Sequence, residues 1–135
     1  MIEFPAGLAN DTDEFKHESL EEAARRELIE ETGYAASNLE LIVRTPGSSS
    51  IATDMLSVYF ATGLAKIGPG GGDASENITV HEVPLKEIHE WLEGQKTQGK
   101  YVDLKVYSGL YYLQNHTPRN ISERTFPGVP RLKDQ

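Results

Sequence analysis

Three glutamates in one short stretch have the side-chain type and spacing to bind a divalent cation. Glu27, Glu30 and Glu31 lie in RRELIEETGY, residues 25–34. On a helix that turns about 100° per residue, Glu27 and Glu31 fall one turn apart and within about 20° of Leu20, in the middle of the apolar stripe. Two buried acids so close together repel each other, and a hard cation such as Mg²⁺ relieves that repulsion. The pattern alone leaves a metal site and an acidic surface helix as equal alternatives.

Arg26 lies to one side of these acids. Its expected position, about 120° from Leu20, lets it brace Glu30 but turns it away from Glu27 and Glu31 taken together. The neighbouring alanines of the same face leave room for a ligand to approach the helix. A cation from outside the chain therefore fits the pair better than Arg26 does.

The helix that carries these acids has clear ends. Ser19 is followed three residues later by Glu22, which forms the Ser-x-x-Glu capping box. Gly33 stands where a C-terminal cap belongs, so we expect the helix to end at Thr32.

The other elements alternate between strand-like and helix-like patterns. Period-two alternation and β-branched residues predict strands or strand ends at residues 2–4, 39–43, 55–64 and 78–83. Apolar spacing predicts helices at residues 84–91 and 104–115, with Trp91 and the tyrosines of the last helix in the core. This order indicates one layered α/β domain over residues 1–117, followed by an irregular tail over residues 118–135.

Composition excludes several classes of protein and partner. The 135 residues include 13 basic and 21 acidic side chains, for a net charge of −8, which disfavours nucleic acid and anionic membranes as partners. The absence of cysteine excludes disulfides, thiolate metal sites and cysteine nucleophiles. No apolar run approaches the roughly 18 residues of a membrane span, so we expect a cytoplasmic protein.

The stretch from Glu18 to Tyr34 resembles the Nudix box, Gly-x₅-Glu-x₇-Arg-Glu-apolar-x-Glu-Glu-x-Gly-apolar. Seven residues follow Glu18, and the segment from Arg26 to Tyr34 then matches throughout. A match of this kind arises by chance in roughly one chain of this length in 10⁵. Ten residues separate Gly7 from Glu18 where the box has five, which indicates an insertion over residues 8–17 at the site entrance.

The resemblance implies the Nudix fold, an α/β domain whose mixed β-sheet is sandwiched between helices (α/β/α). Related pyrophosphatases carry an N-terminal β-domain and an early strand of that sheet. Because Met1 stands so close to the box, we expect this chain to lack both and to turn over substrate weakly or not at all. For the full-length protein the resemblance implies a homodimer.

Three further features are similar to the ADP-ribose and nucleoside-diphosphate-sugar pyrophosphatases of this family. They are the segment Phe4–Gly7, the Glu-Glu-Ala-Ala of residues 21–24, and the pair Pro46–Gly47. That branch has an acid shortly after Pro-Gly, whereas here Ile51 stands near the place and Asp54 is a weak substitute. The resemblance therefore indicates the chemistry more firmly than the substrate.

Carried over residue by residue, the resemblance implies a site for Mg²⁺ or Mn²⁺. Its implied ligands are Glu27, Glu31, the Ala6 carbonyl and, for an additional metal, Glu18. Glu30 is implied as a ligand or as a partner of Arg26, and we count both among the candidate catalytic residues. Glu76 best matches the loop glutamate that binds metal or acts as the base, with Asp73 as second choice. The preceding run, Gly68–Gly72, is predicted to be a flexible loop and is not a P-loop, because no Gly-Lys-Ser/Thr follows.

The implied function is metal-dependent hydrolysis of the diphosphate bond of a nucleoside diphosphate sugar, with ADP-ribose as first candidate. The products are a nucleoside monophosphate and a sugar phosphate. One alternative is a hydrolase of dinucleoside polyphosphates or damaged nucleotides. Another, of a different class, is a non-catalytic Nudix module that binds a regulatory ligand. Such modules have usually lost carboxylates of the box.

Overall fold

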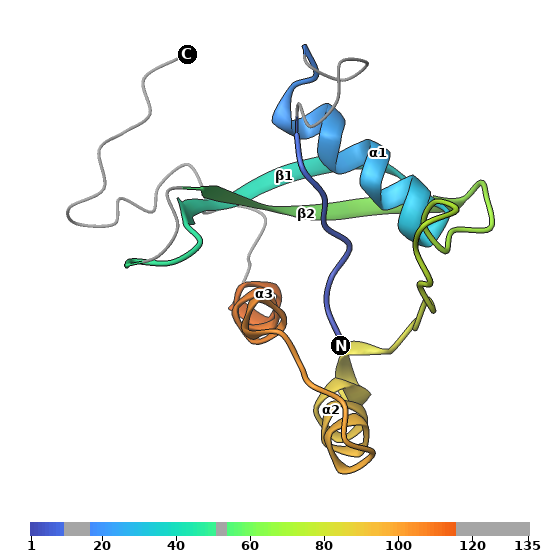
Figure 1. The fold of residues 1–135 in the computed structure, drawn as a ribbon, viewed down its shortest axis with the longest axis vertical. Coiled ribbons are helices and arrows are strands. Elements are labelled where there is room, and N and C mark those ends of the chain that lie inside the picture. Colours follow the sequence, from blue (N-terminus) through green and yellow to red (C-terminus); the bar gives the residue numbers. More distant parts are fainter. Residues whose placement is uncertain (10–16, 51–53, 116–135) are drawn as a thin grey trace.

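The computed structural model describes residues 1–9, 17–50 and 54–115. In chain order the elements are α1 (Leu20–Thr32), β1 (Tyr34–Pro46), β2 (Met55–Lys66), the short 3₁₀ helix η1 (Leu85–Glu87), α2 (Ile88–Thr97) and α3 (Leu104–Asn115). Figure 1 shows α1 along one side of the β1–β2 ribbon and α3 on the other side. Residues of both strands and of α3 line one shared groove. Helices thus flank the sheet, as the predicted α/β layering requires.

Helix α1 has the ends that its sequence predicts. Ser19 Oγ accepts the Glu22 N–H at 3.1 Å, and the Glu22 carboxylate accepts the Ser19 N–H at 2.7 Å, which completes the capping box. At the other end Gly33 adopts the left-handed conformation, with φ 77°, and donates its N–H to the Ile29 carbonyl. Both signals involve residues only a few positions apart, so both ends of the helix could be predicted from the sequence.

The sheet in the described residues consists of two antiparallel strands. Their register runs from Tyr34 opposite Lys66 to Pro46 opposite Met55, with an irregularity between Leu41 and Val43. Strand β1 is longer at both ends than the predicted residues 39–43, because pairing with β2 also holds residues 34–38 and 44–46 in extended form.

The predicted strand at residues 78–83 is wrong. This segment has no regular secondary structure, although Ile78, Val80 and Val83 are half-buried and Thr79 and His81 are exposed. Burial alternates as in a strand only over residues 78–81, because Glu82 is exposed and Val83 is out of phase, and a strand also needs a neighbour for its ladder. Sequence periodicity reports which side chains are buried and carries no information about that neighbour.

The N-terminal segment joins the helical end of the molecule to the box helix. The strand end predicted at residues 2–4 is reduced to one parallel bridge between Ile2 and Val102. The Ile2 N–H donates to the Tyr101 carbonyl at 2.7 Å, and the Ile2 carbonyl accepts the Asp103 N–H at 2.9 Å. From there the segment, dark blue in Figure 1, runs past the sheet to the start of α1.

The two later helices differ in how well they were predicted. Helix α3 (Leu104–Asn115) begins at its predicted first residue and extends to the last described residue, whereas the helix predicted at residues 84–91 begins as η1 and continues as α2 to Thr97. Tyr107 and Tyr111 are exposed, the second at 60%, so the prediction that they belong to the core is wrong. Both tyrosines lie on the side of α3 that faces solvent. Which side of α3 is buried depends on where α2 packs.

The main core lies between α2 and α3. Its buried members are Leu92, Val106 and Leu110, and residues packed against them include Ile2 and Trp91. Trp91 is therefore a core residue, as predicted. No helix among the described residues is long and apolar enough to cross a membrane. The predictions for Ile51, for the tail at residues 118–135 and for most of the insertion at residues 8–17 lie outside the described residues.

Replacing Leu92 by Ala should lower the free energy of unfolding by about 2–5 kcal/mol, because Leu92 is 1% exposed and its truncation leaves a cavity in the core. Leu104→Ala is the matched control, since Leu104 is 79% exposed at the start of α3 and should change stability little. Urea unfolding followed by circular dichroism measures both. Equal losses in the two variants would contradict this description of the core.

Candidate active site

The guanidinium group of Arg26 binds three glutamates at once. Its Nε donates to Glu18 Oε1 at 2.9 Å and its Nη2 to Glu18 Oε2 at 3.3 Å, which makes a two-point contact. Its Nη1 donates to Glu27 at 2.8 Å and to Glu30 at 3.1 Å. The Arg26 side chain is 17% exposed, so this network is largely shielded from water. Hydrogen bonds to Glu18 above all raise the pKa of Arg26, which therefore stays charged.

Arg26 thus contacts one member of the pair, Glu27 and Glu31, from which we expected it to be turned away when the two are taken together. The helical wheel places the Cα–Cβ direction correctly, but the arginine side chain is long enough to curve back along the helix surface. The guanidinium group then reaches the next residue as well as Glu30, one turn ahead. Glu18, which precedes the helix, holds the opposite edge of the same group.

Glu31 meets the N-terminal segment rather than Arg26. The Ala6 N–H donates to Glu31 Oε2 at 3.1 Å. At the next residue, Gly7, an added Cβ would lie 2.0 Å from Glu27 Oε1, so no other residue type fits there without displacing that carboxylate. The first glycine of the box is thus explained by close approach to Glu27.

Burial makes the two central carboxylates harder to ionise. It is the main cause of the raised pKa of Glu27 and of Glu31. Hydrogen bonds from Arg26 and from the Ala6 N–H act in the opposite direction, and the charges of neighbouring acids add to the rise. A buried carboxylate is costly to leave charged and unpaired. A bound cation removes that cost, so it stabilises such a carboxylate.

The two candidate loop acids occupy different surroundings. The Asp73 carboxylate accepts the N–H and the hydroxyl of Ser75 at Oδ1, at 2.7 and 2.6 Å. Glu76 Oε2 accepts the Asp73 N–H at 3.0 Å, and its charge contributes to the raised pKa of both Glu27 and Glu31. Of the two, Glu76 is therefore the acid that acts electrostatically on the box pair.

The donor set suits a hard divalent cation in its chemistry. Carboxylate oxygens from Glu27 and Glu31, one helical turn apart and with raised pKa, are ligands that Mg²⁺ prefers. In the part of the chain that the structure describes, no group of three or more His, Asp or Glu side chains is arranged to hold a metal ion. Three of the box acids are bound to Arg26 instead.

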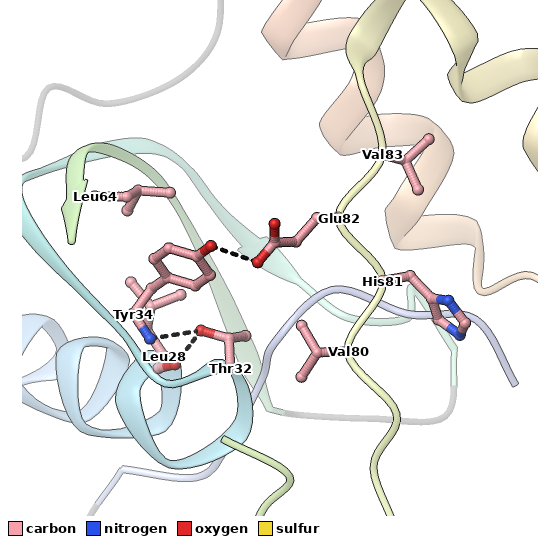
Figure 2. Close-up of a pocket in the computed structure, with 8 residues that line it drawn as sticks. All are labelled: Leu28, Thr32, Tyr34, Leu64, Val80, His81, Glu82 and Val83. Carbon is pink, nitrogen blue, oxygen red and sulfur yellow. Dashed lines mark hydrogen bonds between the residues drawn. The ribbon is translucent and has the colours of Figure 1, made fainter. Parts of the chain in front are cut away.

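A second feature at the C-terminal end of α1 escaped the sequence analysis. A pocket of about 380 Å³ lies between this helix end, the first residue of β1 and residues 80–83. Figure 2 shows the residues that line it. Across this pocket the Tyr34 hydroxyl donates a hydrogen bond to the Glu82 carboxylate. This hydrogen bond is the main cause of the raised pKa of Tyr34. No local pattern joins these residues, because they are 48 positions apart.

Comparison with known protein families decides the classification. Residues 1–104 match the family model described as the NUDIX domain. The chain belongs to the Nudix family. The match includes both the N-terminal segment and the box helix, which are the two parts of the molecule that meet at Glu31.

Several curated relatives of this Nudix chain resemble it to a similar degree. An ADP-ribose pyrophosphatase of Escherichia coli strain K12 is 30% identical over 86% of this chain and 53% of its own length. A GDP-mannose pyrophosphatase of Pectobacterium atrosepticum is 34% identical over 77% of this chain and 52% of its own. A methanol dehydrogenase activator of Bacillus methanolicus is 30% identical over 84% and 57%. The chain spans about half the length of these relatives.

Without metal, Glu31→Gln should stabilise the fold at pH 7.5. Because the folded pKa of Glu31 is raised, the folded state binds its proton more tightly than the unfolded chain does. This contribution to stability is complete below the unfolded value of about 4.3 and is lost as pH rises through the folded pKa. Glutamine removes the charge and still accepts the Ala6 N–H.

Thermal unfolding of the metal-free proteins by circular dichroism measures this effect. The advantage of Glu31→Gln over the wild type should shrink as pH falls towards about 4. Glu90→Gln, an exposed position on α2, is the control and should be no more stable than the wild type at pH 7.5. A Glu31→Gln protein that is no more stable than the wild type at pH 7.5 would show that the buried charge has no cost.

Proposed function

We propose that this chain hydrolyses the diphosphate bond of a nucleoside diphosphate sugar, at the low rate that its sequence leads us to expect, with ADP-ribose as first candidate. The observation that carries the proposal is that Glu27, Glu30 and Glu31, the carboxylates of the second half of the box, lie on one helix, with Glu27 and Glu31 half-buried and of raised pKa. The relatives named as ADP-ribose and GDP-mannose pyrophosphatases support the substrate class. The products are a nucleoside monophosphate and a sugar phosphate.

In this proposal Glu27 and Glu31 hold a divalent cation, Mg²⁺ or Mn²⁺, with the Ala6 carbonyl as a further ligand and Glu18 at an additional metal. When bound, such a cation neutralises charge on the diphosphate, polarises the phosphorus that is attacked and makes the attacking water more acidic. A protein of net charge −8 needs this help to hold an anionic substrate.

The chain's own residues supply orientation and proton transfer. Arg26 and Glu30 hold the Glu27 carboxylate in place through the shared guanidinium contact. Glu76 accepts a proton from the attacking water, whose oxygen forms a new bond to one phosphorus. The bond from that phosphorus to the bridging oxygen breaks, and the bridging oxygen leaves with the other phosphate.

A second candidate function has one specific observation in its favour. The relative named as a methanol dehydrogenase activator matches this chain about as closely as the pyrophosphatases do. A regulatory module that binds a nucleotide without cleaving it would use the same fold. We rank it lower because the carboxylates of the second half of the box are all present. Homodimerisation of the full-length protein and cytoplasmic location stay predictions.

Glu31→Gln should lower turnover of the favoured substrate at least 10²-fold in Mg²⁺, because it removes a charged metal ligand and leaves the helix intact. The measurement is release of nucleoside monophosphate from ADP-ribose and GDP-mannose, with Mg²⁺ and with a chelator. Glu90→Gln serves as the control and should keep wild-type turnover, since Glu90 is exposed on α2, away from the box helix.

Each alternative gives its own result in the same screen. Turnover confined to dinucleoside polyphosphates or oxidised nucleotides would replace the substrate class and keep the hydrolase. Nucleotide binding by calorimetry without cleavage of any of these compounds would favour the regulatory module. Wild-type activity of Glu31→Gln in Mg²⁺ would overturn the metal site itself.

A further inference from the structure

The C-terminal end of α1 is closed by groups from outside the helix. The last carbonyls of a helix have no partner within it, and an unpaired buried carbonyl is costly. In α1 the Ile29 carbonyl accepts the Gly33 N–H at 2.8 Å. The next three carbonyls accept donors from distant residues, in order Gly72 N–H at 3.0 Å, Gly71 N–H at 2.7 Å and Lys66 Nζ at 2.7 Å.

Two of these donors come from the glycine-rich run that the sequence predicted to be a flexible loop. The Glu30 and Glu31 carbonyls that they bind belong to the two final acids of the box. We call Gly70–Gly72 the glycine clamp. All three glycines have positive φ, at 67°, 99° and 79°, and a Cβ on Gly70 would lie 2.5 Å from the backbone of Thr32. Glycine is needed because the loop backbone lies directly on the helix end.

A short turn from Asp73 to Glu76 follows the glycine clamp. The Asp73 N–H donates to Glu76 Oε2 at 3.0 Å, and the Glu76 N–H donates to the Asp73 carbonyl at 3.2 Å, so the four residues form a closed turn. A Cβ on Gly72 would lie 2.2 Å from Glu76 Oε2. The carboxylate of Glu76 therefore occupies the space that a side chain at position 72 would take.

We propose that the glycine clamp is a positioning device that sets Glu76 against Glu27 and Glu31 by fastening its loop to the C-terminal carbonyls of α1. Gly72 is the positioning residue, because it both binds the helix and leaves room for the Glu76 carboxylate. The inference rests on the proposed function, in which Glu76 accepts the proton. It replaces the predicted flexible loop by a loop whose backbone is anchored to the box helix.

Two adjacent glycines separate positioning from backbone strain. Gly71 and Gly72 both have positive φ, so alanine strains the backbone at either position. At Gly71 the nearest atom to the new Cβ is the Ile78 carbonyl oxygen at 3.8 Å, an ordinary contact. At Gly72 the new Cβ collides with Glu76. Gly71→Ala is therefore the matched control for Gly72→Ala.

The kinetic arm measures kcat and KM for the best nucleoside diphosphate sugar in Mg²⁺. Gly72→Ala should lower kcat at least tenfold more than Gly71→Ala, with KM similar, because a displaced base affects the chemical step. In a Glu76→Ala background, Gly72→Ala should lower kcat no further, since the group that it displaces is already gone. Equal losses in the two glycine variants, or additive losses in the double variant, would overturn the proposal.

The second arm needs neither metal nor turnover. Amide hydrogen exchange by NMR, on the metal-free protein, should show protection at Gly71, Gly72 and Asp73, whose N–H groups are hydrogen-bonded. Protection of the Asp73 amide should fall in Gly72→Ala and in Glu76→Ala and persist in Gly71→Ala.

The two arms distinguish failure of the proposed function from failure of the clamp. If the wild type cleaves no nucleoside diphosphate sugar, the proposed function is wrong, and the exchange pattern alone decides whether the clamp positions Glu76. If the Gly71 and Gly72 amides exchange at unprotected rates in the wild type, the clamp is wrong whatever the activity. Asp73 protection that survives Gly72→Ala would likewise overturn it.

Discussion

The contact on which this molecule most depends is the guanidinium group of Arg26 held among three carboxylates. An acid-rich helix face cannot pack near the rest of a protein unless its charge is balanced. Arg26 balances it with a planar fork that contacts Glu18 at two points and reaches Glu27 and Glu30 with a third nitrogen. A lysine has one charged nitrogen and no fixed plane, so it could not hold this geometry.

The rest of the fold brings backbone to the same helix from two directions. The N-terminal segment is tied at Ile2 to the loop before α3, and it delivers the Ala6 N–H to Glu31 and the bare backbone of Gly7 to Glu27. The loop after β2 closes the C-terminal end of the helix with the N–H groups of Gly71 and Gly72. Main-chain groups approach closely and carry little charge, so they can bind an acidic helix without cancelling the charge that a cation would meet.

The fold was predicted well wherever the signal is local. The capping box at Ser19, the stop at Gly33 and the start of α3 at Leu104 all follow from residues a few positions apart, and each is confirmed. The segment at residues 78–83 shows the limit, because burial alternates as in a strand over residues 78–81 but the segment has no ladder partner among the described residues. Tyr111 shows the same limit for a helix, since its exposure depends on which side of α3 meets α2.

For the candidate site, the sequence by itself determined the chemistry: the carboxylates, their helical spacing and the Nudix family that residues 1–104 match. The tertiary structure decided the partners. In the folded protein Glu27 binds Arg26 and Glu31 accepts the Ala6 N–H. The loop that carries Glu76 is hydrogen-bonded to the C-terminal end of α1. The physical reason is that helical periodicity sets directions from one backbone, whereas burial and hydrogen bonding depend on segments that only folding brings together.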